Sequence, residues 1–286
     1  METGRKMRGA GEIEAQYVAL GSSFAAGIGL GPRAPGSSYL CMRSTNGYPQ
    51  QLARLTGLRL VDMTCSGATV AHVLRGGQYF QPPQLDGISE RTQLVTLTAG
   101  GNDLRYVGDL TMLAGRNQRN FAGWLLRRVW KGPLPMAQRR LSKLRADFCE
   151  TLTEIRRRAP RARVFVVTYP AILPPQGTCP VLGMSEDEVT TMREVGARLA
   201  EMTRAVAHET GAEIVDMDVL SSDHHACSST PWVNGWKKAE GVQFHPTLAG
   251  AEATAREIAR VLGCLNASGT ATAGASGPQE RMESGQ

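Results

Sequence analysis

The chain has 286 residues, of which 42% are hydrophobic and 20% are charged, and its formal net charge is +6. That length suits one large domain or two small ones, and it allows a buried core that needs no metal for stability. No stretch approaches the ~20 consecutive apolar residues that a membrane-spanning helix requires.

The positive charge is concentrated in one segment. Ten Lys or Arg residues and one acid, Asp109, lie between Arg105 and Arg145, which gives this segment +9 and leaves −3 for the remainder of the chain. A local basic patch, and not a basic protein, therefore needs an explanation. No nucleic-acid-binding motif accompanies the charge, so we expect no nucleic-acid partner.

Both ends of the chain are predicted to lie outside the folded part. Residues 1–15 carry basic residues but no apolar core, so they do not form a signal peptide and are expected to be a disordered lead-in. Residues 266–286 are small and polar with no apolar period, and are expected to be a flexible tail. We therefore predict a single domain over residues 16–265.

Between these ends, short apolar runs alternate with helical patterns. The runs, which are typical of strands buried on both faces, span 16–20, 58–63, 94–99, 163–169 and 212–216. The helical patterns span roughly 46–56, 68–76, 138–158, 186–210 and 247–262. Such alternation predicts an α/β fold with a parallel sheet covered on both faces, in which ligands bind beyond the carboxyl ends of the strands.

Four short blocks stand where this fold would place a ligand. Ser23 follows the first run, Gly67 the second and Asn102 the third, while His245 precedes the last helical pattern. A serine hydroxyl becomes a good nucleophile when a base takes its proton, and histidine is the usual base. Backbone N–H groups and a side-chain amide are suitable donors to the oxyanion that such an attack creates.

The blocks "GSSFAAG", "SGAT", "GGND" and "FHPTLAG" resemble, in order, those of the SGNH hydrolases, also called the GDSL esterase/lipase family. The resemblance covers about residues 17–262. It is greatest to the actinobacterial-type secreted branch, which has stretches similar to "YPQQLA", "CSGAT", "PPQL" and "PWVNG". It implies a flavodoxin-like three-layer α/β/α sandwich with a five-stranded parallel sheet in the order 2-1-3-4-5. It also implies a serine esterase or lipase that needs no metal or organic cofactor.

By this resemblance Ser23 is the nucleophile and His245 the base, and the oxyanion hole is formed by Ser23, Gly67 and Asn102. Ser22 replaces the usual aspartate before the nucleophile, a position that is not catalytic in the family. Val242 stands where the family usually has the acid three residues before the histidine. We expect the backbone carbonyl of Val242 to hold the imidazole in a Ser–His dyad, with the carboxylate of Glu240 as the alternative.

Asp103, beside Asn102, is left out of the catalytic set because it is expected to cap the helix that follows it. The six cysteines form no CxxC pair, so neither a zinc nor a redox motif is indicated.

The family resemblance also implies two disulfides, Cys41–Cys65 and Cys179–Cys227. Cys149 and Cys264 are expected to be free thiols buried on apolar helical faces, with a third bridge left open. Disulfides and the family branch suggest a secreted or periplasmic protein. The absence of a signal peptide leaves a cytoplasmic location open.

The basic segment is expected to be a helical insertion over about residues 104–146, with the amphipathic stretch "NFAGWLLRRVWKGPLP". It is either a solvated insertion packed on the core, or a lid or dock for an anionic lipid surface or polymer. We otherwise expect a monomer that acts on a small-molecule or lipid ester. The alternatives are a non-catalytic or carbohydrate-binding relative and a surface-binding protein that acts through residues 105–145.

Overall fold

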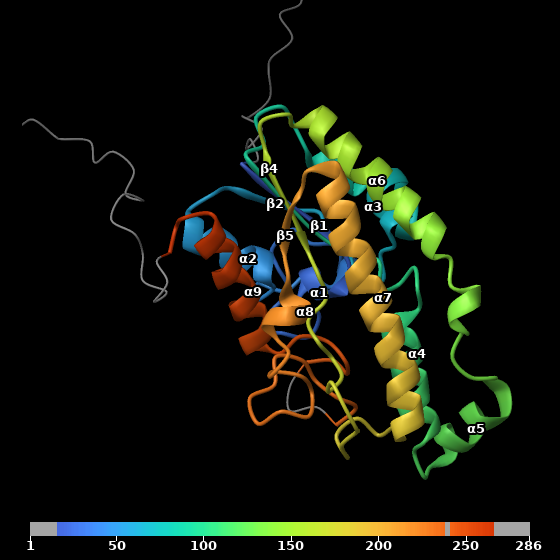
Figure 1. Ribbon diagram of the computed structural model, residues 1–286. Helices are drawn as coiled ribbons and strands as arrows, with labels where there is room; N and C mark the ends of the chain where they lie inside the picture. Colours follow the sequence, from blue (N-terminus) through green and yellow to red (C-terminus); the bar gives the residue numbers. More distant parts are fainter. Residues whose placement is uncertain (1–15, 238–240, 266–286) are drawn as a thin grey trace, which may run out of the picture.

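A five-stranded parallel sheet forms the centre of the computed structural model, which describes residues 16–237 and 241–265 (Figure 1). The strands are β1 (Tyr17–Gly21), β2 (Leu60–Asp62), β3 (Leu94–Thr98), β4 (Arg163–Val167) and β5 (Glu213–Val215). Their order is β2-β1-β3-β4-β5, which confirms the prediction. The lead-in and tail expected at 1–15 and 266–286 lie outside the described residues.

Helices cover both faces of the sheet, as the alternating pattern predicted (Figure 1). One face carries α3 (Val70–Arg75), α4 (Tyr106–Arg116), α6 (Leu141–Arg158) and α7 (Glu186–Thr210). The other face carries α2 (Tyr48–Thr56) and α9 (Leu248–Val261). The five residues of β1 are all buried, and successive side chains enter opposite layers: Val18 packs with the first group and Ala19 with the second.

Helix ends follow local sequence signals. Ser185 caps α7 by accepting from the N–H of Glu188, whose carboxylate accepts from the Ser185 N–H in return, and Gly211 ends the helix with φ 67°. Shorter elements that the sequence did not predict are α1 (Ser23–Ala26) and α8 (Met217–Leu220), with 3₁₀ turns at Tyr39–Cys41, Gln78–Phe80, Gln84–Gly87 and Met136–Gln138.

Both expected disulfides, Cys41–Cys65 and Cys179–Cys227, are confirmed, and Cys149 and Cys264 are free. Cys149 packs against the core on the α6 side of the sheet, whereas Cys264 follows α9 and packs on the opposite side. The sheet separates the two thiols, so no third bridge forms. Cys264 lies beyond the end of α9, and the prediction that it belongs to a helical face is wrong.

The basic segment forms α4, α5 (Phe121–Val129) and the start of α6. Its single acid, Asp109, pairs with Arg139 at 2.7 Å, and both side chains are fully buried. This ion pair joins α4 to the chain ahead of α6, two parts of the insertion that lie 30 residues apart in the sequence. None of the helices in the described part of the chain is long and apolar enough to cross a membrane.

Candidate active site

The nucleophile candidate stands where β1 becomes α1. Gly21 has φ +138°, and a Cβ added there would lie 2.3 Å from the carbonyl oxygen of Thr98, so only glycine fits between β1 and β3. Ser22 continues the pairing by donating its N–H to Thr98 O at 2.9 Å. Ser23 then begins α1 at the carboxyl end of β1, the edge at which α/β sheets bind ligands.

The structure brings Ser23 and His245 together across 222 residues of sequence. Ser23 Oγ lies 2.8 Å from His245 Nε2, a hydrogen-bond distance, and the two residues are only 7% and 9% exposed. The ring of Phe24 lies against the imidazole, with 5.0 Å between centroids. The hydroxyl and the imidazole are thus held in contact and largely shielded from water.

The carbonyl that faces the imidazole differs from the one predicted. His245 Nδ1 lies 2.8 Å from the carbonyl oxygen of Gln243, and the prediction that Val242 supplies this carbonyl is wrong. The Val242 carbonyl instead accepts from the His245 main-chain N–H and from Asn234 Nδ2, both at 3.3 Å. Glu240, the alternative partner, lies outside the described residues.

A turn at residues 242–245 explains this difference. The His245 N–H donates to Val242 O, and Phe244, the third residue of the turn, has φ 55°. A positive φ at that position is the mark of a type II turn, in which the central peptide is reversed relative to type I. The reversed peptide carries the Gln243 carbonyl, and this orientation directs its oxygen at the ring.

Three hydrogen-bond donors are available at the same edge of the sheet. Ser23 is the first residue of α1, where the N–H has no intrahelical acceptor, and Gly67 has φ +82°. Within the described residues neither of these N–H groups has an acceptor. Asn102 Nδ2 donates one hydrogen to Ala68 O at 2.9 Å, which orients the amide and leaves its second hydrogen free.

Two supporting residues were not assigned a role from the sequence. The buried amide of Gln84 accepts from the Gly21 N–H at 2.8 Å and donates to the Gly21 carbonyl at 3.1 Å. The Tyr169 hydroxyl lies 2.9 Å from Ser22 Oγ and accepts from the Gly101 N–H at 3.2 Å. In the sequence, Gln84 belongs to the "PPQL" stretch and Tyr169 lies two residues after β4, but neither feature indicates which residue the side chain contacts.

Burial changes the pKa of two side chains at the site. It lowers the pKa of His245, and the hydrogen bond to the Gln243 carbonyl opposes this change. The base is therefore neutral at neutral pH. Burial raises the pKa of Tyr169 to about 12, so its hydroxyl stays protonated and continues to connect Ser22 with Gly101.

Asp103 caps a different helix from the one expected. Its carboxylate oxygens accept from the N–H of Val70, the first residue of α3, at 3.1 and 3.3 Å, whereas Arg105 precedes α4. The prediction that it caps the following helix is therefore wrong. Burial raises the pKa of Asp103 to about 6, against the effect of its hydrogen bonds.

The comparison with known proteins decides the family. Residues 19–253 match the GDSL-like lipase/acylhydrolase family. The chain belongs to this family. It is accordingly a carboxylic ester hydrolase of the SGNH type.

Similar proteins come from Streptomyces. Lipase 2 of Streptomyces coelicolor is 35% identical over 261 residues, which cover 86% of this chain and 85% of that protein. The crystal structure of an extracellular lipase from Streptomyces rimosus matches with a TM-score of 0.63 at 29% identity, covering 82% of this chain and 94% of that one. Phospholipase A1 from Streptomyces albidoflavus matches with a TM-score of 0.68 at 25% identity, covering 87% and 99%.

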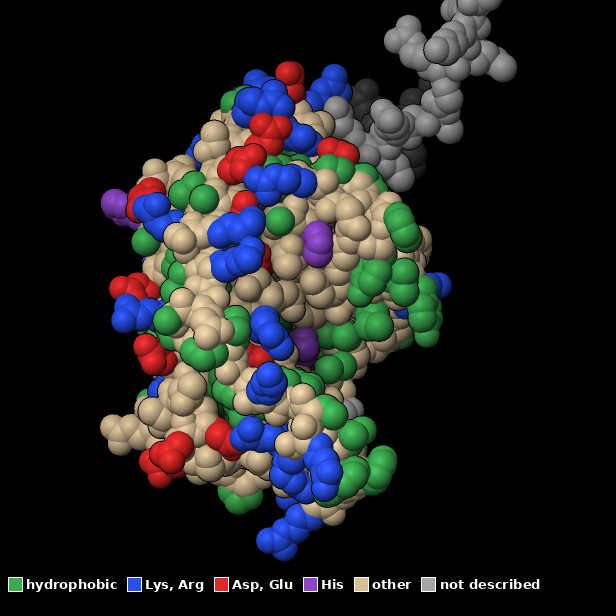
Figure 2. All heavy atoms as spheres, turned by 90° about the vertical axis from the view of Figure 1, so that its right-hand side faces the viewer, with side chains coloured by type: hydrophobic (Ala, Val, Ile, Leu, Met, Phe, Trp, Pro, Cys, Tyr) green, Lys and Arg blue, Asp and Glu red, His purple; other side chains and the backbone are tan. Residues whose placement is uncertain are grey.

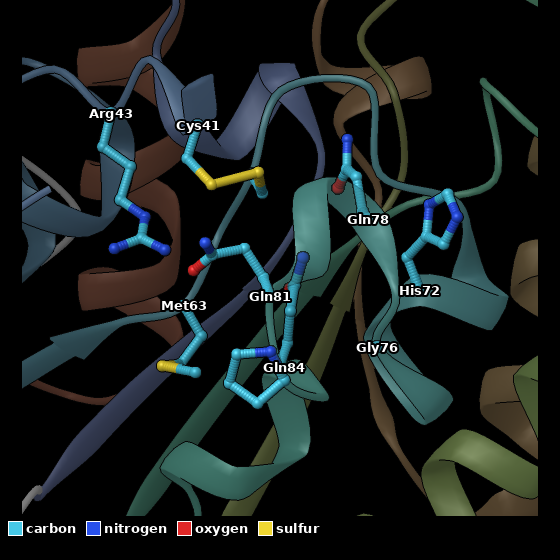
Figure 3. A pocket seen from close by; sticks show the side chains of 10 residues that line it. Cys41, Arg43, Met63, His72, Gly76, Gln78, Gln81 and Gln84 are labelled. Carbon is cyan, nitrogen blue, oxygen red and sulfur yellow. A yellow bond between two sulfur atoms is a disulfide. The ribbon is translucent and has the colours of Figure 1, made fainter. Parts of the chain in front are cut away.

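A small pocket of about 20 Å³ lies beside the glycine block of this SGNH hydrolase (Figure 3). The Cys41–Cys65 disulfide forms one wall, and Arg43, Gln81 and Gln84 project into it. It lies close to Gly67, because the amide of Gln78 in its lining is the group that a Cβ on Gly67 would meet first. Its lining combines amide and guanidinium groups with the apolar side chains of Met63 and Pro82, and it has room for about one water molecule.

Proposed function

We propose that the chain hydrolyses carboxylic esters through an acyl-serine intermediate, with Ser23 as nucleophile and His245 as base. The observation that carries this proposal is the 2.8 Å contact between Ser23 Oγ and His245 Nε2 in a shielded site. Ser23 Oγ attacks the acyl carbon while Nε2 takes the hydroxyl proton. The imidazolium then gives this proton to the leaving alkoxide, and a water activated by the same nitrogen releases the acid and restores Ser23.

The Gln243 carbonyl supports the histidine in this proposal. By accepting the Nδ1–H it selects the tautomer whose Nε2 is free to act as a base. A neutral carbonyl stabilises the imidazolium less than a carboxylate would, which agrees with the lowered pKa of His245. The acid limb of kcat/KM should therefore lie below pH ~6.5, the usual histidine value. A limb above that value in a pH–rate profile would contradict this assignment.

The oxyanion of the tetrahedral intermediate would be bound by the N–H groups of Ser23 and Gly67 and by the free amide hydrogen of Asn102. Support comes from the absence of an acceptor for the two backbone donors within the described residues, and from the Asn102–Ala68 hydrogen bond that orients the third. Donors without a partner in the resting state need no reorganisation when the oxyanion forms.

The relatives narrow the substrate class. Because similar proteins are named lipase and phospholipase A1, we infer that the acyl ester of a lipid is a substrate of this site. The two disulfides, together with an extracellular lipase among the similar structures, support maturation of the chain in an oxidising compartment outside the cytoplasm.

A fluorophosphonate probe and a set of p-nitrophenyl esters from C2 to C16 test the proposal. Wild type should be labelled and should hydrolyse at least part of the series, whereas Ser23→Ala should do neither. Ser22→Ala is the matched control, because it removes a neighbouring hydroxyl that bonds to Tyr169 and does not face His245. A wild-type chain that is not labelled, or labelling that persists in Ser23→Ala, would refute the assignment and favour a non-catalytic relative.

A further inference from the structure

Helix α5 has apolar residues on two faces, and only one face is covered. Gly123 is buried, and Leu126 and Trp130 are partly covered. On the outward side Phe121 is 74%, Trp124 45%, Leu125 43% and Val129 65% exposed. Monomeric soluble proteins rarely leave a group of large apolar side chains in water without a function for them.

The chain at and around α5 carries cations that have no acidic partner among the described residues. Residues 119–131 contain four cations and no acid: Arg119, Arg127, Arg128 and Lys131. Among the ion pairs of the described residues none involves these four, whereas nearby Arg116 pairs with Glu188 at 2.5 Å. Figure 2 shows Lys and Arg side chains beside hydrophobic ones on the lower projection of this side of the molecule.

Aromatic rings and a guanidinium are stacked on the outward side of α5. Phe121 and Trp124 lie with ring centroids 5.5 Å apart, and the guanidinium of Arg128 lies 4.9 Å from the Trp124 ring. These residues are spaced by three and four, so they form one stripe along the helix. An indole with a guanidinium above it is suited to the boundary between lipid headgroups and acyl chains.

Packing connects α5 to the segment that holds His245. A Cβ at Gly115 of α4 would lie 3.3 Å from Leu126 and 3.4 Å from Trp236, so both side chains pack over this glycine. Two residues before Trp236, the N–H of Asn234 donates to the His245 carbonyl at 2.9 Å. The covered face of α5 therefore packs beside the segment that contacts His245.

We propose that the outward face of α5 binds an anionic lipid surface and so presents the active site to its ester substrate. The exposed apolar stripe supplies the part that enters the interface, and the four cations bind the headgroups. A second copy of the chain is a poorer partner, because a twofold contact would place the unpaired cations of two copies opposite each other. The proposal concerns binding, so it stands or falls independently of the Ser23 mechanism.

Co-sedimentation with vesicles tests this proposal. The full chain with Ser23→Ala, which leaves the lipid intact, is mixed with vesicles of phosphatidylcholine alone or with 30% phosphatidylglycerol. Binding should be strong only with phosphatidylglycerol and should shift the tryptophan emission to the blue. Arg128→Glu with Lys131→Glu should lower the partition coefficient at least about tenfold, and Phe121→Ala with Trp124→Ala should do the same.

Arg256→Glu with Arg260→Glu is the matched control. It makes the same charge change on exposed cations of α9, on the other face of the sheet, and should leave vesicle binding unchanged. All variants should hydrolyse a soluble p-nitrophenyl ester at the wild-type rate when Ser23 is present. Equal binding to both vesicles, equal losses in the control, or a dimer in lipid-free buffer that Phe121→Ala dissociates would each overturn the proposal.

Discussion

The Ser23–His245 site and helix α5 lie at the same end of one fold. Polar groups are buried and paired at the site, whereas they are exposed to water on α5. At the site, Ser23, His245 and Ser22 are buried, and each side chain has a partner on another element. On α5, cations and aromatic rings face water, and no acid of the described residues pairs with the four cations. Buried polar groups need internal partners, whereas exposed charges without them remain available to an external surface.

The largest expected effect is the loss of the base, His245. His245→Ala should lower kcat for a soluble ester by about 10⁴ or more, because no other base contacts Ser23 Oγ among the described residues. His224→Ala is the control, since its ring stacks on Trp232 with 4.1 Å between centroids and does not contact Ser23. Steady-state kinetics with circular dichroism checks both variants, and a fall of less than tenfold would remove His245 from the mechanism.

Asn102 tests whether the site provides donors beyond the dyad. Asn102→Ala should lower kcat by about 10²–10³ with little change in KM, as expected for a donor that acts only on the transition state. Asn117→Ala removes an exposed amide of the same kind, which donates to Glu188 at 2.7 Å, and should leave kcat unchanged. A change in KM alone would instead indicate a role in substrate binding.

Asp103 provides a test by pH, because burial raises the pKa of its carboxyl more than its hydrogen bonds and Lys143 lower it. Its folded-state pKa of about 6 exceeds the usual ~3.9 of the unfolded chain, so between these values the folded form binds more protons and stability falls as pH rises. Asp103→Asn should raise the free energy of unfolding by on the order of 1–2 kcal/mol at pH 8, with the gain fading towards pH 4.

Urea unfolding of Asp103→Asn at pH 4, 6 and 8 measures this effect. Asp187→Asn is the control, because it removes an exposed carboxylate from the first turn of α7 and should not stabilise the chain. A gain for Asp103→Asn that is the same at all three pH values would show that ionisation is not the cause.

The smallest expected effect concerns the support of His245. Gln243→Ala keeps the main-chain carbonyl that faces Nδ1, so kcat should stay within about threefold of wild type. Glu240→Ala should likewise change kcat by no more than about threefold if the Gln243 carbonyl is the group that orients the His245 ring. Loss of turnover in Glu240→Ala with the fold intact would instead assign the orienting role to that carboxylate.

Sequence patterns were sufficient for the fold because they reflect local physics. Apolar runs buried on both faces marked all five strands, and helical periods marked α2, α3, α6, α7 and α9 to within a few residues. The order of the four blocks placed Ser23, Gly67, Asn102 and His245 at one edge of the sheet, since parallel strands end on the same side. That placement predicted that Ser23 and His245 would lie close together.

Only the tertiary structure decided which groups these residues meet. The carbonyl at Nδ1 belongs to Gln243 because Phe244 adopts a positive φ. A positive φ is uncommon for an aromatic residue, so the sequence did not predict it. Asp103 caps α3, and not α4 that follows it, because the order of strands in the sheet brings the N–H of Val70 to it across 33 residues. The sequence of α5 indicated a helix and its positive charge, but its apolar residues occur on both faces. Packing against Gly115 determined which of these faces is buried and which is exposed.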